Sequence, residues 1–272
     1  MTEVMRAGAR TVQAPDLEDD RAHAAAERAR GGSLPDQVPP LERSPRLLAL
    51  RARLTADHGD GGGRDGDGGE PAVLPGTALV VVDVQHDFLP GGALGVAGGD
   101  AVIAPLLRAA RDAALVVKTR DAHPAAHCSF AEQGGIWPPH CVAGTHGAEL
   151  HPAIAALPGP VIDKGTALDA DAYSGFDATG LAGVLHQAAI AHVLVGGLAT
   201  DYCVKATALD ALAAGFDVTV LAEAIAAVDV EPGDGERALE EMVAAGARVV
   251  QRWGREDSNL RLTDYESAAL TN

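Results

Sequence analysis

From residue 77 onward the chain alternates between short apolar runs and helical patterns, and this alternation limits the fold more than any other feature. Six runs have the length of β-strands: 78–84, 113–121, 159–165, 192–199, 216–224 and 247–250. Most are rich in valine and continuous, as expected for strands buried on both faces. Helical patterns lie between them, at 100–113, 179–190, 200–215 and 235–246. The alternation predicts an α/β domain of three layers, a mostly parallel sheet flanked by helices.

Residues 1–76 have a different composition, in which charged residues mix with alanine, glycine and proline and end in the run GGGRDGDGGE. Such a segment buries too little apolar surface to offset the entropy lost on ordering, so we expect a mostly disordered N-terminal extension. The glycine run is not a phosphate loop, because no strand precedes it and no Gly-Lys-Ser/Thr follows. We therefore place one domain at 77–255 and a C-terminal tail at 256–272.

The net charge of −17 argues against nucleic acid and anionic membranes as partners, because both require clustered lysine and arginine. No apolar stretch approaches the roughly 20 residues of a membrane-spanning helix, and the first thirty residues lack the apolar run of a signal peptide. Three cysteines do not make a disulfide framework in a chain of this size. We expect a reduced, cytoplasmic protein, and the sequence leaves homo-oligomerisation open.

Reactive side chains follow four of the predicted strands. Asp83 ends the first strand, Asp121 the second and Lys164 the third, while Cys203 follows the fourth in the first turn of a helix. Ligands bind beyond the carboxyl ends of the strands in open parallel sheets. We therefore expect these two acids, the lysine and the thiol to meet at one edge of the sheet.

The position of Cys203 favours a nucleophile, with Thr200 or Asp201 as the N-cap of its helix. The positive end of the helix and the charge of Lys164 would lower the pKa of the thiol. Asp83 could take the thiol proton and later give it to a leaving amine. The alternative is that Cys203 is a small core residue, and its position alone does not decide between the two.

A second group of polar residues has the composition of a metal site. Its members lie in the segments TRDAHPAAHCSF and WPPHC, and they are Asp121, His123, His127 and His140. One carboxylate and three imidazoles suit a single divalent ion of zinc, iron or manganese. The alternative is a set of solvated surface histidines. The nearby His146 and His151 are weaker ligand candidates.

Aromatic residues are only 3% of the chain, yet several fall in loops or at helix starts on the same edge of the sheet: Phe88, Trp137, Tyr173 and Tyr202. Aromatic side chains in this position can line a pocket for a flat ring. The alternative is that they fill the interiors of loops.

Five motifs, in order along the chain, resemble the nicotinamidase (pyrazinamidase) branch of the isochorismatase-like cysteine hydrolases. They are DVQHDFLPGGALGV, TRDAHPAAHCSF, WPPHCVAGTHGAELHP, DKGTALDADAYSGF and GGLATDYCVKATALDA. The resemblance runs from about residue 77 to about 253 and leaves the N-terminal extension without a counterpart. It implies the Rossmann-like fold of that family and a catalytic triad of Asp83, Lys164 and Cys203.

The resemblance also implies the other parts of the site. It makes Asp121, His123, His127 and His140 metal ligands, and it places a cis peptide bond at Leu198–Ala199. The oxyanion hole would be formed by the amides of Ala199 and Cys203. The pocket wall would consist of Phe88, Leu94, Trp137, Tyr173 and Tyr202. Tyr202 stands where relatives often have histidine and Ala122 where they often have an aromatic residue. Neither difference removes a reacting group, and both leave the fine substrate preference open.

The implied reaction is hydrolysis of nicotinamide to nicotinate and ammonia through a cysteine thioester, in NAD salvage. One alternative is an amidase of the same fold that acts on another small amide or a ureido compound, against which the four ligand candidates argue. A non-catalytic binding module should lack a member of the triad, and all three are present. A redox sensor needs a resolving cysteine, for which Cys128 and Cys141 are the candidates.

Overall fold

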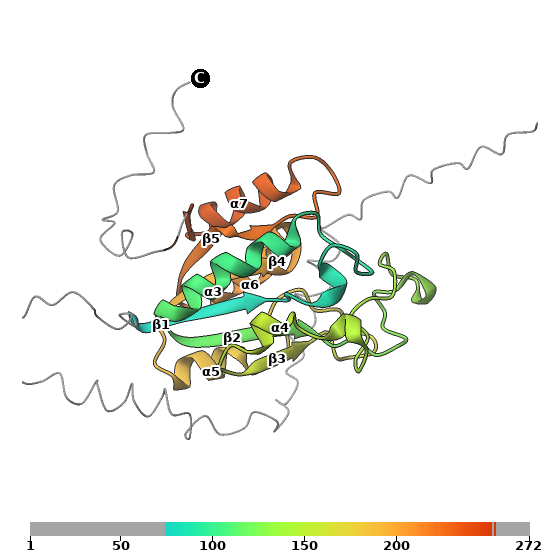
Figure 1. The fold of residues 1–272 in the computed structure, drawn as a ribbon, viewed down its shortest axis with the longest axis horizontal. Coiled ribbons are helices and arrows are strands. Elements are labelled where there is room, and N and C mark those ends of the chain that lie inside the picture. The colour runs from blue at the N-terminus through green and yellow to red at the C-terminus, as the bar shows by residue number, and fades with distance from the viewer. Residues whose placement is uncertain (1–73, 252, 254–272) are drawn as a thin grey trace, which may run out of the picture.

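The centre of the fold is a sheet of six parallel strands in the order β3-β2-β1-β4-β5-β6 (Figure 1). The strands are β1 (Leu74–Val82), β2 (Ala113–Asp121), β3 (Val161–Lys164), β4 (His192–Leu198), β5 (Asp217–Ala226) and β6 (Arg248–Val250). The computed structural model describes residues 74–251 and 253. All six predicted strands are present, and the predicted α/β class is confirmed. The predicted tail and all but the last three residues of the predicted extension lie outside the described residues.

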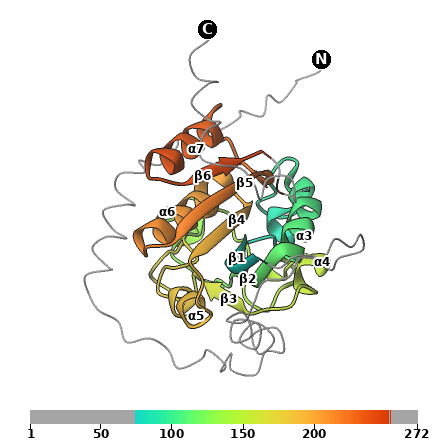
Figure 2. The same ribbon diagram turned by 90° about the vertical axis from the view of Figure 1, so that its left-hand side faces the viewer.

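Helices cover both faces of this sheet and complete the three layers (Figure 2). Their bounds are α3 (Ile103–Asp112), α4 (Pro152–Ala155), α5 (Leu181–Gln187), α6 (Lys205–Ala213) and α7 (Asp234–Ala244). The alternating side chains of β1 divide between two cores. Val80 packs on the side of α5, α6 and α7, and Val81 packs on the side of α3 and α4. Both valines are fully buried, as the continuous apolar run predicts.

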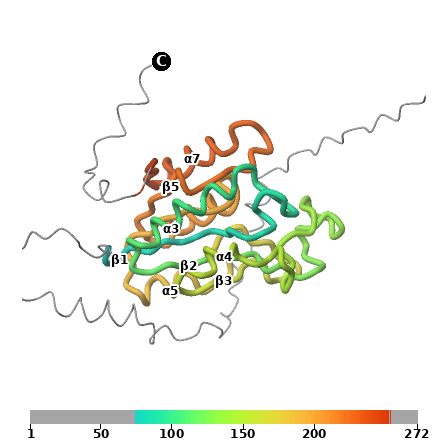
Figure 3. Tube along the Cα trace, viewed as in Figure 1, coloured from blue at the N-terminus to red at the C-terminus, as the bar shows by residue number. Residues whose placement is uncertain are grey.

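The long connection between β2 and β3 carries short elements that the sequence patterns did not predict. They are η4 (Ala131–Gln133), η5 (His146–Ala148) and α4. An antiparallel bridge between Gln85 and Leu150 fixes this connection to the segment after β1. In Figure 3 the connection extends beyond the end of the sheet as a set of green and yellow-green loops. A short helical turn after β1, η2 (His86–Phe88), lies against η5.

The order of the strands determines where a ligand can enter. The chain moves outward from β1 through β2 to β3, and then returns across the sheet to place β4 on the other side of β1. Connections above and below the sheet therefore diverge between β1 and β4, and ligands bind at such a switch point in open α/β sheets. Asp83 follows β1 and Ala199 follows β4 at this position.

Among residues 74–251 and 253, no helix is long and apolar enough to span a membrane.

Replacing Leu106 by alanine tests the packing of α3 on the sheet. Leu106 is fully buried and packs closely on Gly196 of β4. A Cβ added at Gly196 would lie only 2.9 Å from Leu106 Cδ2. We expect Leu106→Ala to lower the free energy of unfolding by roughly 2–5 kcal/mol, because it removes buried methyl groups and leaves a cavity. Urea denaturation measures the change.

The matched control is the same substitution at Leu168, whose side chain is 57% exposed. Leu168→Ala should change the free energy of unfolding by no more than about 0.5 kcal/mol. Equal losses for the two variants would contradict the packing of α3 described above.

Candidate active site

Lys164 brings together the reactive groups that follow different strands. Its Nζ atom lies 3.1 Å from Asp83 Oδ2, 2.6 Å from Asp121 Oδ1 and 3.4 Å from Cys203 Sγ. It also donates to the carbonyl oxygen of Ala172 at 3.0 Å. The four charged or thiol side chains are all buried. The convergence expected from the strand ends is therefore present as a compact group of contacts.

The two carboxylate oxygens of Asp83 have different surroundings. Oδ1 accepts a hydrogen bond from the Thr119 hydroxyl at 2.7 Å. Oδ2 is close to Lys164, but the angles do not fit a hydrogen bond, and it is the one buried side-chain oxygen or nitrogen of the described residues without such a partner. Burial raises the pKa of Asp83, Lys164 opposes this, and the charge of Asp121 adds to it. Asp83 thus has an oxygen suited to accept a proton.

The charge of Lys164 persists despite complete burial. Desolvation alone would lower the pKa of this amine, but the carboxylates of Asp121 and Asp83 outweigh it and hold the pKa well above its usual range. Two negative charges and one positive charge therefore surround the thiol of Cys203.

The predicted lowering of the thiol pKa is wrong for this arrangement. Burial raises the pKa of Cys203 well above its usual range, Lys164 opposes this, and Asp83 and Asp121 add to it. The thiol therefore keeps its proton in the free protein. Because Asp83 and Cys203 offer atoms within 4.8 Å of each other, the proton has a short path to a carboxylate.

The predicted side-chain N-cap is also wrong. Cys203 lies in a π-helical turn, Thr200–Val204, whose N-cap is Ala199, and no side chain caps it. The carboxylate of Asp201 instead accepts the amides of Val228 and Asp229 at 3.0 and 2.9 Å. The loop after β5 offers these two donors, so Asp201 fixes that loop rather than its own helix.

A group that fits a divalent metal ion adjoins Lys164. Asp121, His123 and His140 offer ligand atoms that all lie within 4.8 Å of one another. His123 Nδ1 is 2.9 Å from the carbonyl oxygen of Gly165, and His140 Nδ1 is 2.8 Å from that of Pro138. A carbonyl on Nδ1 fixes the proton there and leaves Nε2 to a metal, as in most histidine ligands.

Burial is the main cause that lowers the pKa of His123 to about 4. The imidazole is therefore neutral near neutral pH, which is the form that binds metals. Its Nε2 atom lies 3.7 Å from Asp121 Oδ2. The donor set of one carboxylate and two imidazoles suits zinc, iron or manganese.

His127, the fourth predicted ligand, is adjacent to this group but is engaged elsewhere. Its ring stacks on that of His123 with the centroids 4.2 Å apart. Nδ1 accepts the Ser129 amide at 3.3 Å, and Nε2 lies 3.1 Å from the carbonyl oxygen of Ala170. Both ring nitrogens thus have hydrogen-bond partners, and the structure brings together three of the four predicted ligands. A ligand role for His127 stays a prediction.

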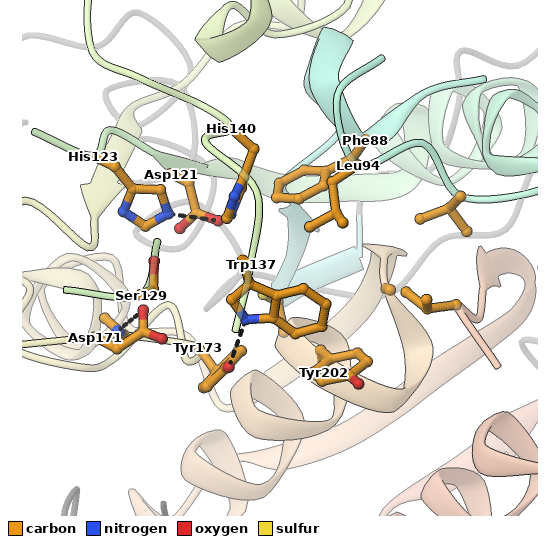
Figure 4. Close-up of a pocket in the computed structure, with 15 residues that line it drawn as sticks. Phe88, Leu94, Asp121, His123, Ser129, Trp137, His140, Asp171, Tyr173 and Tyr202 are labelled. Atoms are coloured by element: carbon orange, nitrogen blue, oxygen red, sulfur yellow. Dashed lines mark hydrogen bonds and ion pairs between the residues drawn. The ribbon is translucent and has the colours of Figure 1, made fainter. Parts of the chain in front are cut away.

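One pocket connects the thiol to the candidate metal ligands (Figure 4). The predicted wall residues that line it are Phe88, Leu94, Trp137, Tyr173 and Tyr202. The Trp137 indole donates to the Tyr173 hydroxyl at 3.1 Å, and the Trp137 and Tyr202 rings meet edge to face. Ala199 and Cys203 also line the pocket, and the peptide bond between Leu198 and Ala199 is cis.

Comparison with known proteins identifies the family of this chain. A family described as "Isochorismatase domain" matches residues 77–252. The chain belongs to the isochorismatase family. It is 40% identical to the nicotinamidase of Escherichia coli (strain K12) over 205 residues, which cover 64% of this chain and 94% of that protein.

Solved structures of similar proteins extend this comparison. The pyrazinamidase of Pyrococcus horikoshii in complex with zinc is 47% identical, with a TM-score of 0.60, and the match covers 65% of this chain and 99% of that chain. The yeast nicotinamidase bound to the inhibitor nicotinaldehyde is 31% identical, also with a TM-score of 0.60. This match covers 64% of this chain and 99% of the yeast chain. The predicted resemblance to the nicotinamidase branch of the family is confirmed.

Two residues that position the site were missed by the sequence reasoning. Gln85 is fully buried, and its Nε2 donates to the carbonyl oxygens of Asp121 and Ala148 at 2.8 and 2.9 Å. Its Oε1 accepts the Asp121 amide at 2.8 Å. Thr119, which anchors Asp83, is the other. Both are polar residues inside motifs quoted above, Gln85 in the first and Thr119 at the start of the second, so the motifs could have indicated them.

Five further pocket residues also escaped the sequence reasoning: Val96, Ser129, Asp171, Ala172 and Val228. Val96 is the last residue of the first motif, so the motif could have indicated it. Val228 belongs to the loop fixed by Asp201, and only the folded chain brings it to the pocket.

Replacing Gly165 by alanine tests the support of His123. Gly165 has φ of +60°, and an added Cβ would lie 2.5 Å from His123 Cε1. We expect Gly165→Ala to displace the imidazole and weaken the binding of a divalent ion by about 10–100-fold, the usual effect of losing an outer support of a ligand. Titration with zinc measures it.

The matched control is Gly98→Ala, because Gly98 has φ of +69° but nothing within 4 Å of an added Cβ. Both variants carry a similar backbone cost, and only Gly165→Ala reaches His123. Unchanged zinc affinity in Gly165→Ala would contradict the role of Gly165.

Proposed function

We propose that the chain hydrolyses nicotinamide to nicotinate and ammonia and so feeds NAD salvage. One observation carries this conclusion: a single pocket holds Cys203, with Lys164 and Asp83 behind it, beside the group of Asp121, His123 and His140. Identity of 40% to nicotinamidases over most of their length supports it. We also propose that the enzyme works in the cytoplasm, because three cysteines in a chain of this size do not make a disulfide framework.

The pocket wall fits a flat aromatic amide. Phe88, Trp137 and Tyr202 present ring surfaces to the same pocket, and the Trp137–Tyr173 hydrogen bond fixes the orientation of the indole. We place the pyridine ring of the substrate between Phe88 and Trp137, with its carboxamide toward Cys203. Aromatic walls of this kind bind flat rings through dispersion and burial of apolar surface.

The first chemical step forms a carbon–sulfur bond. Asp83 takes the thiol proton on Oδ2, and the Cys203 sulfur attacks the carboxamide carbon, while Lys164 keeps its charge beside both groups. The carbonyl oxygen gains negative charge, and the amides of Ala199 and Cys203 donate to it. A strong donor at such a position stabilises the transition state by about 3–4 kcal/mol.

The second part releases both products. The carbon–nitrogen bond breaks, the nitrogen takes the proton from Asp83, and ammonia leaves a thioester on Cys203. Asp83, again a carboxylate, then takes a proton from a water molecule that attacks the thioester. The carbon–sulfur bond breaks, the proton on Asp83 returns to the sulfur, and the product leaves as nicotinate once its carboxyl proton passes to solvent.

Asp121, His123 and His140 would hold a divalent ion, and the zinc complex of the Pyrococcus horikoshii relative supports zinc among zinc, iron and manganese. When bound, the ion supplies a Lewis acid that can accept the ring nitrogen of the substrate or a water molecule. Asp121 belongs to the ligand group and also pairs with Lys164, so its side chain connects the ligand group to the triad.

Replacing Cys203 by alanine tests the nucleophile. We expect Cys203→Ala to lower ammonia release from nicotinamide by about 10⁴-fold or more, as in other hydrolases that lose their nucleophile. The control is Cys128→Ala, since Cys128 has no part in the proposed chemistry and should support turnover at the wild-type rate. Full activity of Cys203→Ala would overturn the covalent mechanism.

Replacing His123 by alanine tests the ligand group. We expect His123→Ala to lose its bound metal and to raise KM for nicotinamide by at least about tenfold, because the ion and the substrate share the pocket. Metal analysis and steady-state kinetics measure the two effects, and circular dichroism checks that the fold persists. Wild-type metal content and KM in this variant would contradict the assignment.

A further inference from the structure

A second group of metal-ligating side chains lies outside the proposed active site. His86 belongs to η2, and His146 and Glu149 lie at η5, in segments separated by the whole of α3 and β2. Within the described part of the chain, this is the one group of three or more such residues that includes no member of the triad or of the ligand group at Asp121. Its ligand atoms all lie within 4.8 Å of one another.

The two imidazoles already face each other. Their ring centroids are 4.0 Å apart, with 30° between the planes. His146 Nδ1 lies 2.9 Å from Glu149 Oε2. A carboxylate on one ring nitrogen orients the imidazole and increases the basicity of the other nitrogen, which is the usual support of a histidine ligand.

Backbone hydrogen bonds hold the segments that carry these side chains. The His86 amide donates to the carbonyl oxygen of Glu149 at 3.0 Å, and the His151 amide donates to that of Val84 at 2.8 Å. The Glu149 amide donates to the carbonyl oxygen of His146 at 3.0 Å. An ion would therefore need to order only partly or fully exposed side chains, because the backbone beneath them is already fixed.

The second imidazole distinguishes this group from a common surface pair. A carboxylate beside one exposed histidine is common on protein surfaces. Here the His86 ring also stacks on that histidine, with the ring centroids 4.0 Å apart.

We propose that His86, His146 and Glu149 form a second binding site for a divalent transition-metal ion such as Zn²⁺. Imidazole nitrogens with one carboxylate favour zinc, nickel or copper over magnesium or calcium, which prefer oxygen ligands. Water completes the coordination, since His146 and Glu149 are exposed. A bound ion would connect η5 to η2, whose last residue, Phe88, lines the pocket.

Metal counting tests the site in the full-length chain. Wild type, His86→Ala and His146→Ala are dialysed against the same zinc-buffered solution and analysed for zinc per chain. We expect each variant to bind one equivalent less than wild type. His186→Ala, which removes another exposed histidine on α5, should bind as much as wild type.

A second comparison separates this site from the ligand group of the pocket. His140→Ala should lose the ion of the pocket and keep the second equivalent, and the double variant with His146→Ala should lose both. Bound Cu²⁺ should show nitrogen hyperfine coupling from two imidazoles in the electron paramagnetic resonance spectrum of His140→Ala, and this signal should vanish in the double variant.

Equal zinc content in wild type, His86→Ala and His146→Ala would overturn the proposal, as would a copper spectrum that the second substitution leaves unchanged. The outcome does not depend on the proposed reaction, because both measurements count or observe the ion without substrate. All three ligands are partly or fully exposed, and circular dichroism verifies that the variants remain folded.

Discussion

A buried lysine between two carboxylates and a thiol is the interaction on which the rest of this site depends. Lys164 loses its hydration entirely, and only the paired charges of Asp83 and Asp121 make that position stable. The same contacts determine how the proton of Cys203 is held. Removal of either carboxylate would leave the buried ammonium of Lys164 with a single anionic partner, so the structural and chemical roles of these residues cannot be separated.

Most of the fold could be predicted from the sequence, because strands buried on both faces have continuous apolar runs that need no tertiary information. Val80 and Val81 are consecutive residues that pack into different cores, so both positions of the strand are apolar. The turn η5 could not be predicted in the same way, since distant backbone partners hold the segment that follows it. The Gln85–Leu150 bridge is such a partner, and it joins segments that are 65 residues apart.

The same distinction between local and tertiary information applies to the candidate site. Residues at the ends of strands, such as Asp83 and Lys164, could be placed from the order of elements alone. The pKa of Cys203 could not, because local position indicates a lowered value and the burial created by tertiary packing reverses it. The spacing of His127 suits a metal ligand, and the hydrogen bonds of its two nitrogens to Ser129 and Ala170 are contacts that spacing alone could not indicate.

The position of β3 has a consequence for how activity is lost. This strand has four residues, lies at the edge of the sheet and pairs only with β2. Yet it carries Lys164 and leads directly to Gly165, which contacts His123, so the triad and the metal-ligand group both depend on this edge strand. The Arg120–Asp163 ion pair also joins the strand to β2. Edge elements open locally at lower free energy than the centre of a domain. Local opening of this strand would disable the enzyme while the remaining five strands stay folded. The rate of this opening, which amide hydrogen exchange in β3 reports, should therefore set the lifetime of the active state.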